Sequence, residues 1–228
     1  AQGIECTTGP LGQGLTMAVG MALGERMMNA RFGDNLVDHH TYVIAGDGCL
    51  MEGISHEAIS MAGHLKLAKL IVLFDDNAIS IDGGTDMAVS DDQLARFQAS
   101  GWDVAAVDGH DPDAIAAAIE AAKKTNTPSM IACKTVIGRG APTKEGTSGT
   151  HGAPLGDEEI AAARELMGWP HAPFEVPDDV LGSWRAVGSK NVSEREAWEA
   201  RLSSSGSQAE FEAAIAGELP ASLNDAVN

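Results

Sequence analysis

Two apolar runs, joined by a segment with helical periodicity, constrain the fold of this chain most. The runs cover residues 42–45 (YVIA) and 70–74 (LIVLF). Short runs without polar alternation are typical of strands buried on both faces of a parallel sheet. Between them, apolar residues recur at the spacing of one helix face, namely Ile54, Ala58, Met61, Ala62 and Leu65. We therefore expect a strand, a helix over 52–65 and a second strand.

Polar residues follow both of these strands. Gly46-Asp47-Gly48 comes directly after the first run, and Asp75-Asp76-Asn77 comes after the second. The segment between the two motifs, residues 49 to 76, is 28 residues long. Because parallel strands end at the same edge of a sheet, and ligands bind at that edge, we expect Asp47 and Asn77 to lie together there.

The residue types at this edge predict a metal and a phosphate group. Asp47 offers a carboxylate oxygen, Asn77 an amide oxygen, and Ile79 a backbone carbonyl. Such a set is too small for a calcium cage and suits Mg²⁺, which takes its other ligands from a diphosphate and water, with Ca²⁺ or Mn²⁺ as substitutes. Gly46 and Gly48 let the backbone approach closely, and an N–H there can donate to a phosphate oxygen.

Composition excludes several classes of partner. The 228 residues carry a formal net charge of −18, which disfavours nucleic acid and anionic membranes. The attraction for a diphosphate must then come from Mg²⁺, glycine amides and histidine. The 3 cysteines are far apart and odd in number, which argues against disulfides and for a reducing, cytoplasmic location. No run of 18 apolar residues and no signal-like segment is present.

Further elements alternate along the chain. A glycine-rich entry at 7–14 leads into a helix of about 20 residues. The patterns then predict a helix over 91–100, a strand over 102–107, a helix over 111–124 with Asp111 as its cap, and a strand over 130–136. This alternation is typical of an α/β fold, a doubly wound parallel sheet with helices on both faces.

The last third of the chain is expected to differ. Residues 138–156 form a long loop rich in Gly, Thr and Ser, of a kind that is often functional. A helix follows to Met167, then a proline-rich connector, and then amphipathic helices over 191–203 and 207–217. We therefore expect one domain over 1–168, followed by a connector and helical extension over 169–228.

Four runs of the sequence resemble transketolases, in the same order. They are TTGPLGQG at 7–14, GDGCLMEGISHEAIS at 46–60, DDNAISIDG at 75–83 and HGAPLG at 151–156. Gly-Asp-Gly with a following Asn is also the signature of thiamine diphosphate enzymes in general. The resemblance covers nearly the whole chain and weakens after about Asp178. It implies the diphosphate-binding domain of a transketolase, without its upstream part and without the pyrimidine-binding domain that normally follows.

The resemblance implies contacts between this chain and the cofactor. Gly9 and Leu11 would contact the aminopyrimidine ring of thiamine diphosphate, and Ile81 and Ile137 the thiazolium ring. Of the residues already placed at the edge, Gly46, Gly48 and Asn77 would contact the diphosphate together with His151.

Three further polar residues have both a functional and a simpler interpretation. His151 would also shuttle protons or stabilise charge on the substrate oxygen, although a lone loop histidine is usually only solvated. The resemblance places Glu52 and Glu57 in a carboxylate network at a dimer interface, linked to the glutamate that activates the cofactor. Acidic residues at a helix start are otherwise explained by the helix dipole.

The activity implied is transfer of a two-carbon ketol unit from a ketose phosphate to an aldose phosphate, as in the pentose phosphate pathway. The activating glutamate would come from a homodimer partner or a separate chain, so we expect this chain alone to be inactive. Three alternatives stay open: a sister enzyme such as dihydroxyacetone synthase, a cofactor-binding subunit of a split enzyme, and a catalytically inert fragment.

Overall fold

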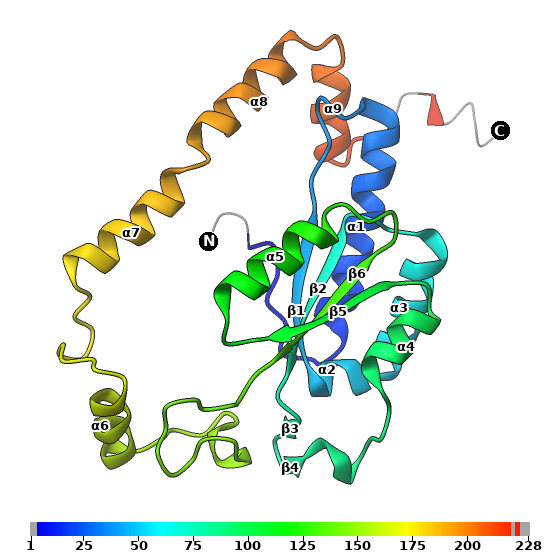
Figure 1. The fold of residues 1–228 in the computed structure, drawn as a ribbon. Helices are drawn as coiled ribbons and strands as arrows, with labels where there is room; N and C mark the ends of the chain where they lie inside the picture. The colour runs from blue at the N-terminus through cyan, green and yellow to red at the C-terminus, as the bar shows by residue number, and fades with distance from the viewer. Residues whose placement is uncertain (1–3, 220–221, 224–228) are drawn as a thin grey trace. The chain divides into compact units, whose positions relative to one another are not determined.

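A four-stranded parallel sheet lies at the centre of the computed structural model, which describes residues 4–219 and 222–223 (Figure 1). Its strand order is β1-β2-β6-β5. The register is continuous across the sheet, since Ala45 of β1 pairs with Phe74 of β2 and Phe74 pairs with Ala132 of β6. The predicted parallel sheet is confirmed, with bounds β1 (Thr41–Gly46), β2 (Leu70–Asp76), β5 (Asp103–Asp108) and β6 (Ser129–Lys134).

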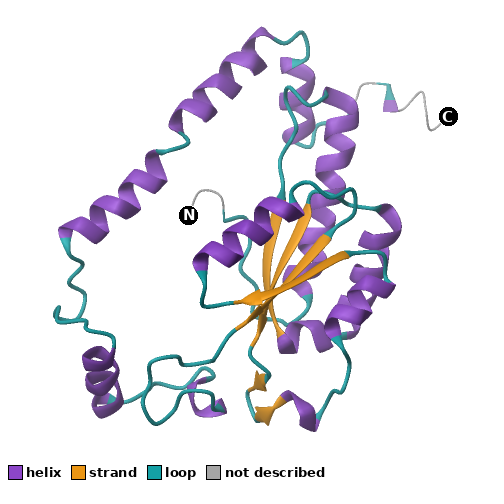
Figure 2. Ribbon diagram, viewed as in Figure 1, coloured by secondary structure: helices purple, strands orange, loops and turns teal. Residues whose placement is uncertain are grey.

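Helices cover both faces of this sheet, as predicted (Figure 2). On one face, α1 (Gln13–Phe32), α3 (Gly53–Leu65) and α4 (Gln93–Ala99) enclose the main core. The largest side chains of that core are fully buried, among them Leu15, Ile59, Leu70, Phe97 and Met130. On the other face, α5 (Pro112–Ala122) packs on a smaller core that contains Ile71 and Ile131.

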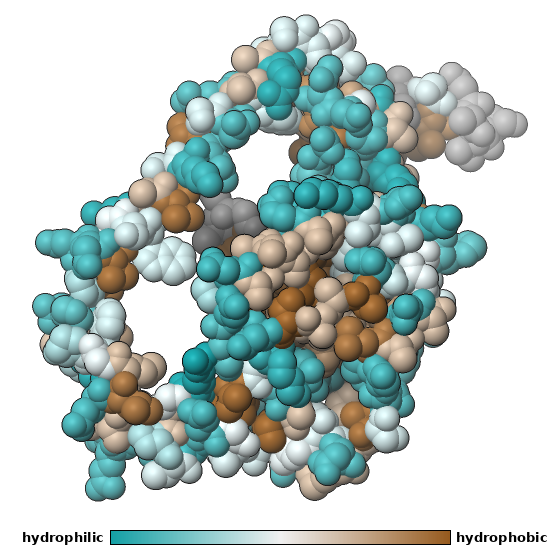
Figure 3. All heavy atoms as spheres, viewed as in Figure 1, coloured by the Kyte–Doolittle hydropathy of each residue, from teal (hydrophilic) through white to brown (hydrophobic). Residues whose placement is uncertain are grey.

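The edge strand β1 is not fully covered on the face that carries α5. Its residues Tyr42 and Ile44 are 48% and 77% exposed. They pair with Ile71 and Leu73, whose side chains belong to the α5 core, so they point to the same side of the sheet. Figure 3 shows hydrophobic side chains gathered over this face. This part of the sheet therefore lacks a covering layer in the described chain.

The helix after β1 differs from the expected one. A short helix, α2 (Asp47–Met51), begins at Asp47 itself, and α3 begins at Gly53. Glu52 separates them because its backbone is extended, with ψ of 141°. The apolar spacing used for the prediction starts at Ile54 and does not report on α2. Asp47 is therefore the first residue of a helix and not part of a glycine turn.

The start of α5 follows from local chemistry. Asp111 caps α5, since its side chain accepts N–H bonds from Asp113 (3.0 Å) and Ala114 (3.1 Å), and Pro112 is the first helical residue.

The strand β6 ends at Lys134 and not at the expected residue 136. Beyond β2, β3 (Ile79–Ser80) and β4 (Gly83–Gly84) form a separate antiparallel hairpin, followed by the 3-10 turn η1 (Thr85–Met87).

The C-terminal part is helical, with α6 (Asp157–Leu166), α7 (Asp178–Ser189), α8 (Val192–Ser204) and α9 (Gln208–Ile215). The sequence patterns gave no element over 178–189. None of its described residues is buried, although Val180, Trp184 and Val187 recur at the spacing of one helix face. Among residues 4–219 and 222–223, no helix has both the length and the apolar content to cross a membrane.

The described residues form two compact units. Of the described residues, the first unit comprises 4–26 and 39–170, and the second comprises 27–38, 171–219 and 222–223. In the second unit, Leu36, Val37, Leu202 and Phe211 form a small core, and the Trp198 indole donates to Leu36 O at 2.9 Å. The division into domains 1–168 and 169–228 stays a prediction, and the second unit also includes a segment from near the start of the chain.

Candidate functional site

The loop tips after β1 and β2 touch one another at the carboxyl edge of the sheet. Asp47 Oδ2 accepts the backbone N–H groups of Asn77 (3.3 Å) and Ala78 (3.2 Å). Ala78 adopts the left-handed region, with φ of +59°, and this turns the chain so that successive N–H groups face the carboxylate. The structure therefore brings Asp47 and Asn77 together, and it places Ile79 one residue beyond this turn.

The Asn77 side chain is held on both sides. Its Oδ1 accepts the backbone N–H of Ile79 at 2.9 Å, and its Nδ2 donates to Asp75 Oδ2 at 3.3 Å. The other carboxylate oxygen of Asp75 accepts the hydroxyl of Thr135, which follows β6. We did not single out Asp75 or Thr135 in the sequence. The only signal for Asp75 was its position two residues before Asn77 on an extended segment, which puts both side chains on one face.

The electrostatic environment of Asp47 favours a bound cation. Burial raises the pKa of the half-buried Asp47 carboxyl, and the charge of Asp76 raises it further, against the lowering effect of the two N–H bonds. The charge of Lys134 also lowers this pKa, and Lys134 is paired with Asp76 at 3.2 Å. In the described part of the chain, no three His, Cys, Asp or Glu side chains gather as a metal site. One carboxylate, one amide oxygen and a backbone carbonyl fit a hard ion such as Mg²⁺.

The space beside the glycines is open. A Cβ at Gly46 would meet no atom within 4 Å, whereas one at Gly48 would meet Leu11 Cδ1 at 3.3 Å. The N-terminal loop reaches this point because Gly12, with φ of +81°, lies against the start of α3, where a Cβ would come within 2.9 Å of Glu52. Leu11 is 51% exposed, so an apolar side chain beside Gly48 is available to a ligand. Gly9, also exposed, has open space around it.

A cavity of about 220 Å³ has Asp47 in its wall, whereas Gly46 and Gly48 do not line it. It is lined by the end of β2, by η1 and by the start of α4, and its wall includes Asp76, Asp91 and Asp92. The negative charge of several carboxylates around one small volume disfavours the binding of an anion there. A diphosphate would therefore reach this edge from the glycine side and not from the acidic cavity.

Ile81 and Ile137 also lie at the carboxyl edge of the sheet. Ile81 follows β3 at the hairpin turn and is 70% exposed, and Ile137 follows β6 and is half-buried. Ile81 is thus accessible at a loop tip, although single exposed apolar side chains are common on protein surfaces. Both positions are therefore compatible with apolar contacts to a bound ring.

The loop that carries His151 folds back toward the end of β6. Gly138, with φ of +66°, packs so closely on Thr150 that a Cβ would lie 2.6 Å from its Cγ2. His151 follows the 3-10 turn η2 (Ser148–Thr150), and its side chain is exposed. Within residues 4–219 and 222–223, no hydrogen bond joins its ring to Asp47 or Asn77. The structure brings His151 back toward Ile137 but not into contact with the expected metal ligands.

The carboxylate of Glu159 closes the same loop. Its Oε1 accepts the N–H groups of Thr143 (2.8 Å) and Lys144 (3.2 Å), and its Oε2 accepts the Thr143 hydroxyl (2.7 Å). The N–H of Thr143 is the main cause that lowers the pKa of Glu159, followed by the Thr143 hydroxyl. On the other side of the loop, Lys144 Nζ donates to Leu155 O at 2.6 Å.

We expect hydrogen exchange at Thr143 and Lys144 to depend on Glu159 and on pH. At pH 6, Glu159→Ala should speed exchange of both amides about tenfold, because charged acceptors form strong hydrogen bonds. The folded pKa is lowered, so this protection is complete above the unfolded pKa of about 4.3 and is lost as pH falls through the folded value. The exposed neighbour Glu158 has no such partners, and Glu158→Ala is the matched control. Equal exchange in both variants at pH 6 would contradict the assignment.

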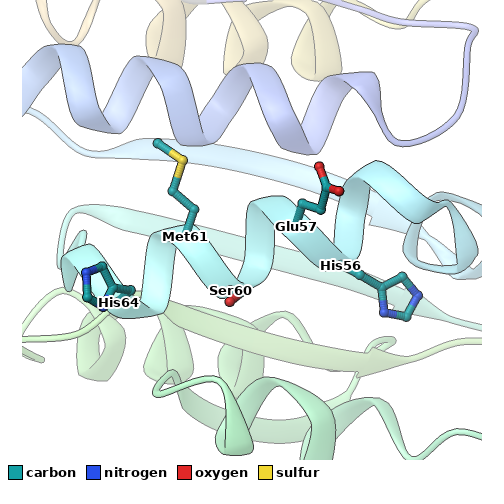
Figure 4. Close-up of a pocket in the computed structure, with 5 residues that line it drawn as sticks. All are labelled: His56, Glu57, Ser60, Met61 and His64. Atoms are coloured by element: carbon teal, nitrogen blue, oxygen red, sulfur yellow. The ribbon is translucent and has the colours of Figure 1, made fainter.

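Glu52 directly precedes α3, and Glu57 lies in the second turn of that helix. Both are exposed, and neither forms an ion pair with another of the described residues. Glu57 lines an open groove of about 570 Å³ along the helix, together with His56, Ser60, Met61 and His64. Figure 4 shows Glu57 and Met61 projecting from the same side of α3. The predicted interface network has no partner within this chain and stays a prediction.

Comparison with known proteins identifies the family that the chain matches. The family described as "Transketolase, thiamine diphosphate binding domain" matches residues 1–220. A transketolase of Cereibacter sphaeroides is 62% identical over 97% of this chain, which spans 34% of that protein. A transketolase structure from Leishmania mexicana aligns with a TM-score of 0.90 at 44% identity, covering 96% of this chain and 34% of the other.

A third similar structure includes a ligand in its description. It is a transketolase of Pichia stipitis in complex with sedoheptulose-7-phosphate, and it is 41% identical with a TM-score of 0.88. The alignment covers 94% of this chain and 33% of that chain. The chain thus spans about a third of the length of the transketolases that it matches. These relatives are transferases by name, and the matched region is their cofactor-binding domain. The chain belongs to the transketolase family, in its thiamine diphosphate-binding domain.

Proposed function

We propose that this chain anchors thiamine diphosphate through Mg²⁺ and so supplies the diphosphate-binding part of a transketolase active site. The observation that carries the proposal is the contact of Asp47 Oδ2 with the N–H groups of Asn77 and Ala78. This contact supports the proposal, because it joins the Asp47 carboxylate to the segment that carries the Asn77 amide and the Ile79 backbone, at the edge where ligands of parallel sheets bind. The family match gives this geometry its cofactor.

The proposal gives roles to the other residues of the edge as well. A Cβ at Gly46 would meet nothing within 4 Å, and the backbone N–H groups at Gly46 and Gly48 would donate to diphosphate oxygens. The exposed side chains of Leu11 and Ile81 would pack against the cofactor rings, with Ile137 beside them and Gly9 contacting the aminopyrimidine through its backbone. His151, exposed at the end of η2, would hold or transfer a proton at the substrate oxygen.

The reaction we propose is ketol transfer. A ketose phosphate such as sedoheptulose-7-phosphate, present in the Pichia stipitis complex, would give a two-carbon unit to an aldose phosphate, as in the pentose phosphate pathway of the cytoplasm. When bound, the cofactor supplies the carbanion chemistry that breaks and forms the carbon–carbon bond. The protein contributes anchoring, orientation and charge.

A partner completes the proposed site. The chain spans about a third of its relatives, and a glutamate that activates the cofactor is not among the residues gathered at this edge. We propose that a homodimer partner or a separate chain supplies it, in contact with Glu52 and Glu57. Both carboxylates are exposed and form no ion pair with other described residues, which is consistent with such an interface.

Calorimetry of the 228-residue chain tests this function. Thiamine diphosphate should bind only with Mg²⁺ present, and Asp47→Ala should weaken that binding by more than about 100-fold, because even the loss of an outer partner of a metal ligand costs about 10–100-fold. The matched control is Asp103→Ala, at an exposed aspartate that begins β5 at the other end of the sheet. Binding that is indifferent to Mg²⁺, or equal in the Asp47 and Asp103 variants, would contradict the proposal.

A further inference from the structure

We propose that Asp75 and Thr135 are positioning residues that fix the orientation of the Asn77 amide, so that its oxygen and not its nitrogen is presented to the metal. The inference rests on the proposed function for its ligand. Its geometry is independent of that function, because every contact that it uses lies within the chain.

The first step is the polarity of the amide contacts. Asn77 Nδ2 lies 3.3 Å from Asp75 Oδ2, and Asn77 Oδ1 lies 2.9 Å from the N–H of Ile79. A carboxylate only accepts hydrogen bonds, and a backbone N–H only donates. Rotating the amide by half a turn would therefore set oxygen against oxygen and N–H against N–H. Asp75 and Ile79 together select one orientation.

The second step is what holds Asp75. Its Oδ1 accepts the Thr135 hydroxyl, and Thr135 also donates its backbone N–H to Asp76 O at 3.1 Å. One carboxylate oxygen of Asp75 therefore accepts from Thr135, and the other accepts from Asn77. The neighbouring Asp76 does not compete for these donors, because its carboxylate is paired with Lys134.

The third step is what holds Thr135. Gly109, which follows β5, approaches it so closely that a Cβ there would lie 2.4 Å from Thr135 Cγ2 and 2.9 Å from Lys134 O. Its N–H donates to Lys134 O at 2.8 Å. Contacts therefore run along the sheet edge, from the end of β5 through β6 to β2 and the amide of Asn77. Such outer contacts orient metal ligands, and their loss typically lowers metal affinity about 10–100-fold.

The test compares Thr135→Val, which keeps the shape but removes the hydroxyl, with Thr135→Ser, which keeps the hydroxyl. In the ¹⁵N-labelled 228-residue chain without ligand, one Asn77 side-chain proton should exchange about tenfold more slowly than those of the exposed Asn126. Thr135→Val should largely remove this difference, and Thr135→Ser should retain it. Exchange at Asn77 as fast as at Asn126 in the unaltered chain would overturn the proposal.

A second measurement connects the amide to the metal. In calorimetry with Mg²⁺ and thiamine diphosphate, Thr135→Val should raise the Mg²⁺ concentration needed for half-maximal binding about tenfold, and Thr135→Ser should restore it. Unchanged Mg²⁺ dependence in Thr135→Val, with normal binding by the unaltered chain, overturns the positioning role and leaves the proposed function standing. If the unaltered chain shows no Mg²⁺-dependent binding, the proposed function is contradicted and the metal drops out of this inference. The exchange measurement then still decides whether Thr135 orients the amide.

Discussion

Gly63→Ala is expected to destabilise the folded chain by about 3 kcal/mol, at the upper end of the usual cost of overpacking. Gly63 lies in α3, where a Cβ would come 1.8 Å from Ser100 O and 2.9 Å from Ser100 C. The obstructing atoms belong to the backbone of the turn between α4 and β5, so no side-chain rotation relieves the clash. Either α3 or this turn must move, and both contribute to the main core.

The matched control is Gly20→Ala in α1. Gly20 is also a helical glycine, but a Cβ there would meet nothing within 4 Å. Alanine favours the helix by about 0.5–1 kcal/mol over glycine at such a position. Urea unfolding followed by circular dichroism should therefore show a lower midpoint for Gly63→Ala and an unchanged or higher one for Gly20→Ala. Similar midpoints for the two variants would mean that α3 and residues 100–102 are not packed as described.

Phe97→Ala is expected to cost about 3–5 kcal/mol, the range for removing a buried aromatic side chain. Phe97 is fully buried in α4 and meets the Trp102 ring edge-to-face, with centroids 4.9 Å apart. Trp102 in turn donates its indole N–H to Ile59 O at 2.8 Å. The deletion would leave a cavity between α4, α3 and the sheet and would loosen the Trp102 contact.

The same substitution at Phe174 is the control for this prediction. Phe174 is 105% exposed, so Phe174→Ala removes no buried contact and should change stability by less than about 0.5 kcal/mol. Thermal unfolding of the two variants measures the difference directly. Equal losses of stability would contradict the placement of Phe97 in the core.

The sheet and the meeting of Asp47 with Asn77 were predictable because their signals are local. Continuous apolar runs identify buried strands, and parallel pairing then puts the residues that follow them at one edge. In the structure, Gly46 pairs with Asp75, as this placement requires. Two short segments of the sequence are enough to predict it. Composition and periodicity were sufficient up to that point.

The rest depends on contacts between distant residues. The hydroxyl of Thr135 reaches Asp75 across 60 residues of sequence, and no spacing rule connects them. The close approach of Gly63 to Ser100 is equally hidden, since a glycine in a helix reads as a weak helix former. Glu52 interrupts the helix after β1 although its own propensity favours helix. These features result from tertiary packing, which overrides local preference.

The core of the second unit has a consequence for synthesis on the ribosome. Trp198 donates to Leu36 O although 162 residues separate them, and Phe32 of α1 meets Phe211 edge-to-face at 5.2 Å. At translation rates of about 5–20 residues per second, Leu36 would wait roughly 10 to 30 s for its partner to emerge. Meanwhile Phe32, Leu36 and Val37 would remain open to chaperones, and all four strands of the sheet, the last of which ends at Lys134, are synthesised within that interval.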